Sequence, residues 1–208
     1  MISKKCKQIL AILNSLYPDA EAELKFKNDY QLIISVVLSA QCTDKKVNQV
    51  TPELFKKYKN FKELGLASEA EVAKIIHPVN YYKTKAKNII KLSQQVVTDF
   101  KNKLPTDKDA LQSLAGVGRK TANVVQCEKG ITPALPVDTH VFRVSHKLGL
   151  SNGKTPESVE FDLMEKFPPE SWRDLHHQLI LHGRRVCKAQ HPLCDECRLA
   201  MICPNKKM

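Results

Sequence analysis

The chain has 208 residues, with 33 Lys and Arg against 22 Asp and Glu, which gives a net charge of +11 and a pI near 9.3. This length can bury a substantial core in one domain or in two small ones. The longest apolar stretch, Leu32–Ala40, has nine residues and contains two serines. A membrane span takes ~20 apolar residues, so no membrane partner is expected. The positive surplus favours a polyanionic partner such as DNA, although dispersed lysines can also reflect a lysine-rich proteome.

Helical periodicity runs through the chain, and we predict an all-α fold. The run Gln31–Leu38 fits a strand or a buried helix equally well. Several expected helices follow residues that commonly cap a helix, namely Thr43 or Asp44, Ser68 with Glu71 at capping-box spacing, Asp107, Thr155 and Ser171. In chain order, the helices are expected near residues 9–16, 44–58, 69–76, 83–100, 108–114, 118–127, 139–148, 156–167 and 172–182.

The segment Leu114–Ala122 contains a Gly-x-Gly turn between two expected helices. Gly116 and Gly118 allow positive φ and a close approach of the backbone to another surface. The N–H groups that open the second helix have no intrahelical acceptors, so they can bind a phosphate of one nucleic-acid strand. An ordinary helix–helix turn is the alternative. Lys120 lies in the first turn of the second helix, where it can act as an amine nucleophile that forms a Schiff base or simply neutralise a phosphate.

Asp138 stands at the start of the next expected helix, where a helix N-cap is its simplest role. The helix from Gly118 to about Cys127 is ~15 Å long, and the link from Gly130 to Val137 can span roughly 20–25 Å. The chain can therefore run back along this helix and place Asp138 beside Lys120. A carboxylate beside an uncharged amine could stabilise a cationic sugar and transfer protons.

Four cysteines, Cys187, Cys194, Cys197 and Cys203, stand close together near the end of the sequence. Four thiolates on one compact loop can bind Zn²⁺ or an iron–sulfur cluster, and the spacing leaves both open. Disulfides or ordinary buried thiols are the alternatives. The chain starts without an apolar signal sequence, so we expect a cytoplasmic protein, in which disulfides rarely persist. Other candidates are interpreted as structural residues, namely Cys6, Cys42, Cys127, Trp172, His176, His177 and His182.

The motifs LSAQCTD from Leu38, LAGVGRKTANVV from Leu114, PVDTHVFRVSHKLGL from Pro136 and LILHGRRVC before the remaining cysteines occur in one order. In this order and spacing, from Gln8 to Cys203, the chain resembles endonuclease III, a family of bifunctional DNA glycosylases with a helix-hairpin-helix motif. The resemblance implies that Lys120 is the nucleophile and Asp138 the catalytic aspartate. It also implies that the four cysteines hold a [4Fe-4S] cluster.

The same resemblance implies DNA contacts. Gln41 would fill the gap left by a flipped base, and Tyr81 would occupy the wedge position of a second inserting loop. The remaining expected contacts are the hairpin residues Gly116, Gly118 and Arg119, together with Arg184 and Lys188 near the first cysteine. Two departures stand out. Ala115 replaces a usual proline, which we expect to loosen the turn, and His77–Tyr82 replaces a more usual Gly-containing loop.

The implied fold has two helical domains with a DNA groove between them. A six-helix bundle would cover residues 23–133, and an iron–sulfur domain would cover 1–22 and 134–208. The implied function is removal of oxidised pyrimidines from double-stranded DNA, followed by β-elimination at the abasic site. We expect a monomer, associated with the nucleoid in a bacterium. Relatives that remove mismatched adenine or thymine lack the lysine, and a DNA-binding zinc ribbon without enzymatic activity is a rival from another class.

Overall fold

The computed structural model describes residues 2–130 and 134–206. Within those two ranges every regular element is an α-helix or a 3₁₀ turn, which confirms the all-α prediction. None of the described helices is long and apolar enough to cross a membrane.

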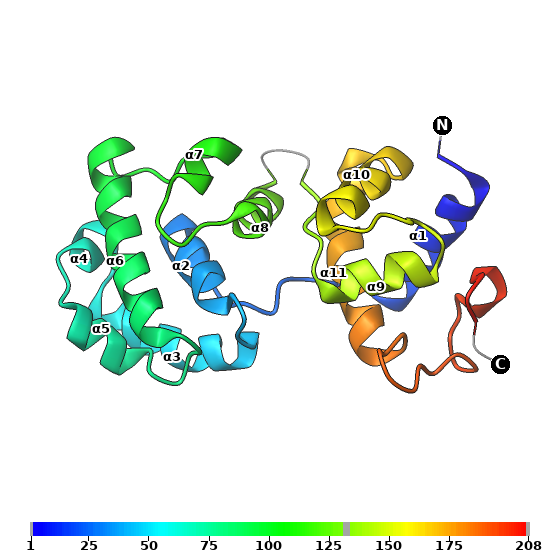
Figure 1. The fold of residues 1–208 in the computed structure, drawn as a ribbon, viewed down its shortest axis with the longest axis horizontal. Helices are drawn as coiled ribbons and strands as arrows, with labels where there is room; N and C mark the ends of the chain where they lie inside the picture. The colour runs from blue at the N-terminus through cyan, green and yellow to red at the C-terminus, as the bar shows by residue number, and fades with distance from the viewer. Residues whose placement is uncertain (1, 131–133, 207–208) are drawn as a thin grey trace. The chain divides into compact units, whose positions relative to one another are not determined.

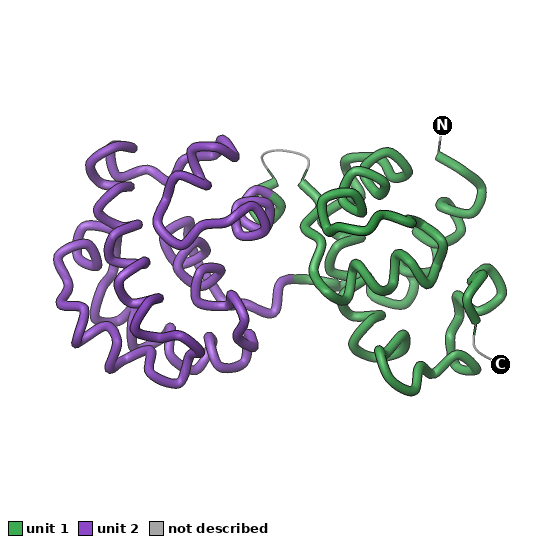
Figure 2. The backbone as a smooth tube through the Cα atoms, viewed as in Figure 1, with its two compact units in different colours: residues 1–21, 127–208 green, residues 22–126 purple. Residues whose placement is uncertain are grey.

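The chain forms two compact units (Figure 2). We call residues 22–126 the central unit, and residues 1–21 together with 127–208 the terminal unit. The resemblance implied boundaries near residues 23 and 133, and residue 133 lies outside the described residues. The end of helix α8 (Arg119–Lys129) belongs to the terminal unit, where the Glu128 carboxylate contacts Arg173 and His177.

The central unit packs its helices around a core that is centred on α2 (Asp29–Ser39). Every residue of α2 from Leu32 to Leu38 is buried, so the ambiguous apolar run is a helix that is buried on all sides. The longest helix, α6 (Tyr82–Asp99), packs against α2 and two neighbouring helices (Figure 1). The other helices of this unit are α3 (Asp44–Lys57), α4 (Phe61–Gly65), α5 (Glu69–Ile75), α7 (Lys108–Gln112) and most of α8.

The terminal unit joins the first helix of the chain to its last helices. This unit has a hydrophobic core of its own, which is formed by apolar side chains of α1 (Lys4–Leu16), α9 (Thr139–Lys147), α10 (Pro156–Lys166) and α11 (Trp172–Arg185). Gly183 of α11 lets this helix lie close to α9, because a Cβ on Gly183 would lie 3.0 Å from Cβ of His140. Trp172 is buried in this core and donates its Nε1–H to the carbonyl of Phe167, as expected for a core residue.

The helix caps follow the sequence in most cases. The side chains of Thr43, Asp107 and Thr155 accept backbone N–H groups of α3, α7 and α10. Ser68 and Ser171 also stand at the N-cap positions of α5 and α11, but neither side chain makes a cap hydrogen bond. Ser171 instead donates to the carbonyl of Pro168.

The three cysteines outside the C-terminal group are free thiols. Cys6 and Cys127 are buried, as the structural interpretation expects, whereas Cys42 is half-buried. Cys42 lies just beyond the end of α2, in the surface loop that also carries Gln41.

Candidate active site and metal centre

The two glycines of the predicted hairpin turn have different structural roles. Gly116 has φ of 79°, and a Cβ there would lie 3.0 Å from Cβ and Nδ2 of Asn88, so both conformation and packing require glycine. A Cβ on Gly118 would meet no atom within 4 Å. Gly118 therefore leaves an open backbone surface directly before α8, where a ligand strand can approach closely.

The turn that joins α7 to α8 is fastened by Gln95 of α6. The N–H of Ala115 donates to Oε1 of Gln95 at 2.8 Å, and Nε2 of Gln95 donates to the carbonyl of Ser113 at 3.1 Å. A proline at position 115 would have no N–H to donate. Ala115 therefore makes a hydrogen bond to Gln95 that a proline could not make, and the looser turn stays a prediction.

Lys120 lies in the first turn of α8, and its side chain is exposed. The first hydrogen bond of this helix runs from the N–H of Ala122 to the carbonyl of Gly118. The N–H groups of Arg119, Lys120 and Thr121 precede this bond, so they lie at the positive end of the helix dipole without intrahelical acceptors. The structure thus places an exposed amine beside a group of donors suited to a phosphate.

Asp138 is the N-cap of α9 and is half-buried. Its Oδ1 accepts the backbone N–H groups of His140 and Val141, each at 2.8 Å. In the described part of the chain, Oδ2 accepts no hydrogen bond. The carboxylate therefore caps the helix with one oxygen and keeps the other for a second partner. Lys120 belongs to the central unit and Asp138 to the terminal unit. That the two side chains lie beside each other stays a prediction.

Sequence reasoning missed Arg143, which connects the helix of Asp138 to the first cysteine. Its guanidinium donates to Nδ1 of His140 at 3.2 Å, to the carbonyl of Gly183 at 2.8 Å and to the carbonyl of Cys187 at 3.1 Å. Because Nδ1 of His140 accepts this bond, the ring carries its proton on Nε2. Burial lowers the pKa of His140, with an opposing contribution from Asp138. The available signal was an arginine three residues after a histidine that neighbours Asp138.

The loops of Gln41 and Tyr81 meet on the surface of the central unit. Both residues have left-handed backbone conformations, with φ of 53° and 57°. Both side chains are exposed, and that of Tyr81 keeps 67% of its surface in solvent. Nδ2 of Asn80 donates to the carbonyl of Gln41 at 2.7 Å. The structure therefore brings together the two residues that were predicted to insert into DNA.

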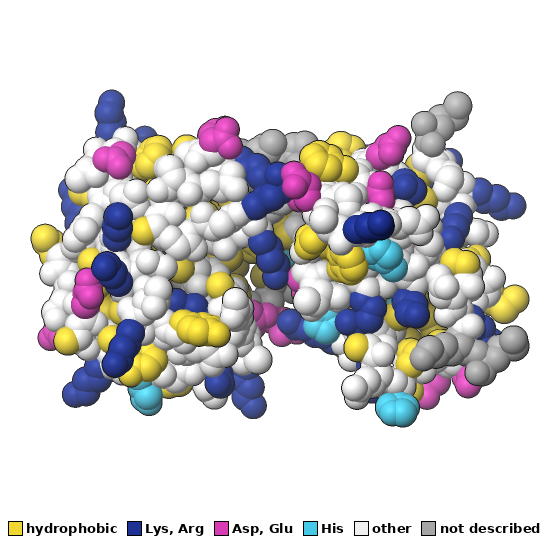
Figure 3. All heavy atoms as spheres, viewed as in Figure 1, with side chains coloured by type: hydrophobic (Ala, Val, Ile, Leu, Met, Phe, Trp, Pro, Cys, Tyr) yellow, Lys and Arg dark blue, Asp and Glu magenta, His cyan; other side chains and the backbone are white. Residues whose placement is uncertain are grey.

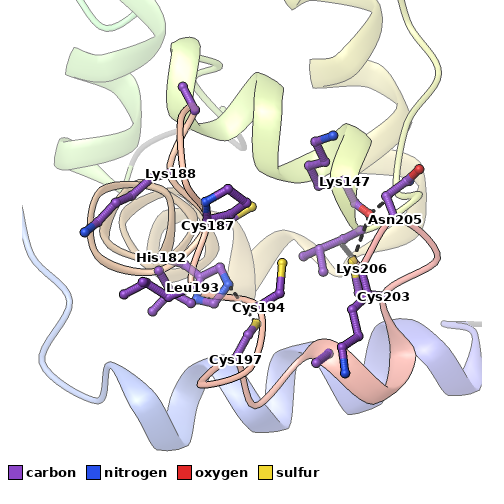
Figure 4. A pocket seen from close by; sticks show the side chains of 15 residues that line it. Lys147, His182, Cys187, Lys188, Leu193, Cys194, Cys197, Cys203, Asn205 and Lys206 are labelled. Atoms are coloured by element: carbon purple, nitrogen blue, oxygen red, sulfur yellow. Dashed lines mark hydrogen bonds between the residues drawn. The ribbon is translucent and has the colours of Figure 1, made fainter. Parts of the chain in front are cut away.

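The four C-terminal cysteines line one cavity of about 60 Å³ (Figure 4). Cys203 donates its Sγ–H to the carbonyl of Lys147 at 3.2 Å. Sγ of Cys197 lies 3.6 Å from Nε2 of His182, whose Nδ1 is 3.1 Å from the hydroxyl of Tyr17. The four thiols therefore surround one space. Their side chains are not yet arranged as ligands, because among the described His, Cys, Asp and Glu residues no three form a group able to hold a metal ion.

Electrostatics of this cavity disfavour bare thiolates. Burial raises the pKa of Cys187 and of Cys197, and the neighbouring cysteines raise both further. For Cys187 the positive charge of Arg143 acts in the opposite direction. Four negative sulfurs in one partly buried space need a compensating cation. The residues therefore fit a positively charged metal group whose ligands are thiolates.

The histidines His176 and His177 lie in a buried network, as their structural interpretation expects. Nδ1 of His176 is 2.8 Å from the carbonyl of Pro136, and Nε2 of His177 is 2.7 Å from Oε1 of Glu128. Burial alone would raise the pKa of Glu128, but His177 and Arg173 lower it overall. The contacts of Glu128 with Arg173 and His177 join the last turn of α8 to α11.

Basic side chains are spread over the visible faces of both units (Figure 3). Arg184 lies in the last turn of α11, and Lys188 follows Cys187 in the cysteine loop. Both are exposed. The structure thus leaves these two predicted phosphate contacts accessible, next to the cavity that the cysteines line.

Comparisons with known proteins agree with this geometry. The model of the HhH-GPD superfamily of base excision DNA repair proteins matches residues 34–169. The chain is 45% identical to endonuclease III of Bacillus subtilis over 201 residues, covering 96% of this chain and 92% of the relative. It is 42% identical to endonuclease III of Synechocystis sp. over 208 residues, with 99% and 95% coverage. A solved structure of a trapped endonuclease III–DNA covalent intermediate matches with a TM-score of 0.90 and 41% identity, covering 99% of this chain and 98% of that one.

Proposed function

This chain belongs to the HhH-GPD superfamily of base excision DNA repair proteins, as a member of its endonuclease III group, and we propose that Lys120 is its nucleophile and Asp138 its catalytic carboxylate. It is a DNA glycosylase and abasic-site lyase. The observation that carries the assignment is the exposed amine of Lys120 in the first turn of α8, directly after the open backbone at Gly118. The relative trapped as a covalent intermediate with DNA supports covalent chemistry at such an amine.

In the proposed reaction the damaged nucleotide leaves the base stack, which costs a few kcal/mol and least for a lesion that pairs poorly. The unprotonated form of the Lys120 amine attacks C1′, and the bond from C1′ to the base breaks. The base leaves with the bonding electrons and takes one of the two protons of the attacking nitrogen. Water then protonates the ring oxygen of the sugar, the bond from C1′ to this oxygen breaks, and the nitrogen lone pair forms a protonated iminium at C1′. This iminium acidifies the proton on C2′, whose removal expels the phosphate at C3′ and cuts the strand.

Asp138 would act on the same nucleotide through Oδ2. Because Oδ1 is already bound by two N–H groups of α9, the carboxylate has a fixed orientation at a helix N-terminus. A fixed negative charge stabilises the positive charge that develops on the sugar as the base departs. We therefore assign Asp138 to the excision step more than to the elimination.

DNA would be held through its backbone by the hairpin. The N–H groups at the start of α8 would bind one phosphate, with the Arg119 side chain beside them and Gly116 and Gly118 providing the close approach. Arg184 and Lys188 would neutralise further phosphates. Gln41 and Tyr81 would enter the duplex near the space that the flipped nucleotide leaves.

We propose that Cys187, Cys194, Cys197 and Cys203 hold a [4Fe-4S] cluster. All four line one cavity, so their thiolates can bind one shared metal group. The family resemblance favours iron and sulfur over a single zinc ion. When bound, the cluster would close the loop that carries Lys188; the residues themselves provide the thiolates and, through His182, a neighbouring ring nitrogen.

The proposed substrates are oxidised pyrimidines and abasic sites in double-stranded DNA, handled by a monomer in the bacterial cytoplasm at the nucleoid. The test is a panel of duplexes that carry thymine glycol, dihydrouracil, uracil, an abasic site or adenine opposite 8-oxoguanine. Borohydride should trap a covalent enzyme–DNA adduct on the oxidised pyrimidines and on the abasic site. Lys120→Gln should abolish the adduct and keep DNA binding. A Lys120→Gln protein that is trapped at the wild-type rate would place the nucleophile on another amine.

A further inference from the structure

Lys85 is a buried lysine in the first turn of α6. Only 6% of its surface is exposed, and its ammonium donates to the carbonyls of Leu38 at 2.8 Å and Ala40 at 2.6 Å. Burial lowers its pKa. An ammonium is costly to remove from water, and here two carbonyls, not a carboxylate, compensate it. These hydrogen bonds indicate that the role of Lys85 is structural, namely to fix the two carbonyls that it binds.

The two carbonyls that Lys85 binds lie at the end of α2, where carbonyls lack intrahelical partners and the helix dipole is negative. The chain turns sharply there, because the N–H of Cys42 donates to the carbonyl of Ser39. Within this turn, Gln41 adopts φ of 53°, a left-handed conformation that is strained for a residue with a Cβ. The buried cation thus supports the backbone on the side of Gln41 that faces α2.

Asn80 binds Gln41 itself. Its Nδ2 donates to the carbonyl of Gln41 at 2.7 Å. Asn80 and Lys85 are five positions apart, at the start of α6, and between them Tyr81 also has a left-handed backbone, with φ of 57°. The segment that presents Tyr81 therefore binds the carbonyl of Leu38 in α2 and the carbonyls of Ala40 and Gln41 in the loop of residues 40–42, which we call the Gln41 loop.

We propose that Lys85 and Asn80 are positioning residues that lock the Gln41 loop to the start of α6, so that Gln41 and Tyr81 face the duplex as one preformed wedge. This inference rests on the proposed DNA insertion by Gln41 and Tyr81. A loop that is already ordered does not have to lose backbone freedom when it enters the base stack. Each additional residue that must be ordered lowers the insertion equilibrium roughly 10-fold.

The experiment compares two substrates in the full-length holoenzyme. The first is a duplex with one dihydrouracil, whose excision requires the base to be flipped. The second is a single-stranded oligonucleotide with a preformed abasic site, whose cleavage needs no wedge. Lys85→Met removes the ammonium and keeps the length of the side chain, and Lys85→Arg restores a cation. Lys87→Met, which changes an exposed lysine of the same helix, is the matched control.

Lys85→Met should lower single-turnover excision from the duplex by about 10-fold and leave single-strand cleavage unchanged. Lys85→Arg should recover part of the loss, and Lys87→Met should retain wild-type excision. Asn80→Ala changes an exposed side chain and should lower duplex excision selectively as well. Because both residues hold one loop, the double variant should lose less than the product of the single losses. A 2-aminopurine opposite the lesion should report less insertion in both single variants.

Equal losses on both substrates, or no loss on the duplex, would overturn the proposal. If Lys85→Met does not fold, Asn80→Ala at the exposed position 80 decides alone. A loss of excision on the duplex only would support the proposal, and unchanged excision would contradict it. Failure of the proposed function looks different: the wild-type enzyme itself would then release no dihydrouracil and cut no abasic site. A wild type that is active while Gln41→Ala has no effect would remove the wedge assignment on which the inference rests.

Discussion

Replacing Asp138 with Asn should separate the catalytic role of this residue from its structural role. In the structure Oδ1 caps α9 by accepting two N–H groups at 2.8 Å each. The carboxamide oxygen of Asn can accept the same two bonds, and Asn is as good an N-cap as Asp. Only the charge is lost, and its interaction with the helix dipole is worth about 0.3–1 kcal/mol. The variant should therefore fold with nearly wild-type stability.

The effect on the reaction should be much larger. Loss of one electrostatic or acid–base group slows a step by roughly 10²–10⁴-fold, which corresponds to about 3–5 kcal/mol of activation free energy. Single-turnover excision of thymine glycol, read after hot alkali, should fall by this factor. Strand cleavage at a preformed abasic site should fall less, because no base leaves in that reaction.

Two further variants identify the cause of any loss. Asp138→Ala removes the charge and the cap, so it should excise as slowly as the Asn variant and also lose about 0.5–2 kcal/mol of unfolding free energy. Thr155→Ala, which removes the cap of α10 in the same unit, should lose stability only. The reasoning is refuted if Asp138→Asn excises at the wild-type rate while Asp138→Ala is slow, since Asp138 would then act only as a cap.

Four other perturbations test separate parts of the molecule. Cys194→Ser should bleach the absorbance near 400 nm and weaken DNA binding, and stoichiometric zinc without iron in anaerobically prepared wild type would contradict the cluster. Lys188→Ala should weaken binding to every duplex alike and reduce the slope of log K against log salt by about one unit; an unchanged slope would place the DNA elsewhere. Gln95→Leu should cost about 0.5–1.5 kcal/mol in urea unfolding, because one partly buried and one exposed hydrogen bond to the backbone of the hairpin turn are lost. Burial lowers the pKa of His176 to about 4, so the folded chain stays neutral there while the unfolded chain takes up a proton. Unfolding free energy should therefore fall as pH decreases from about 6.5 to 4, and His176→Asn should flatten this dependence.

The features that were predicted from sequence are those decided by neighbours in the chain. The cap of α10 lies within four residues of its partners, and Thr155 accepts from Ser158 as its spacing indicates. The order of the motifs also indicated the family and the helical fold. Spacing alone placed four thiols on one loop, and the structure gathers them around one cavity.

Ser68, an N-cap residue without a cap hydrogen bond, shows where local spacing fails. Ser68 and Glu71 have the spacing of a capping box, but the Glu71 carboxylate binds the ammonium of Lys57 and the hydroxyl of Tyr58 on another helix. A tertiary partner has therefore taken one half of the motif. Propensity rules describe the isolated helix, and they lose their force when a neighbouring helix offers a charged partner.

The contacts of Lys85 and Asn80 with the Gln41 loop could not be predicted from the sequence for a different reason. Lys85 and Ala40 are 45 positions apart, and Asn80 and Gln41 are 39 apart. In both cases the acceptor is a backbone carbonyl, which every residue has, so the sequence carries no mark of the partner. The one visible signal was a lysine on the buried stripe of α6 that continues through Ile89 and Val96. A charge on an apolar stripe indicates that something polar must face it, but only the fold shows that this is the end of α2.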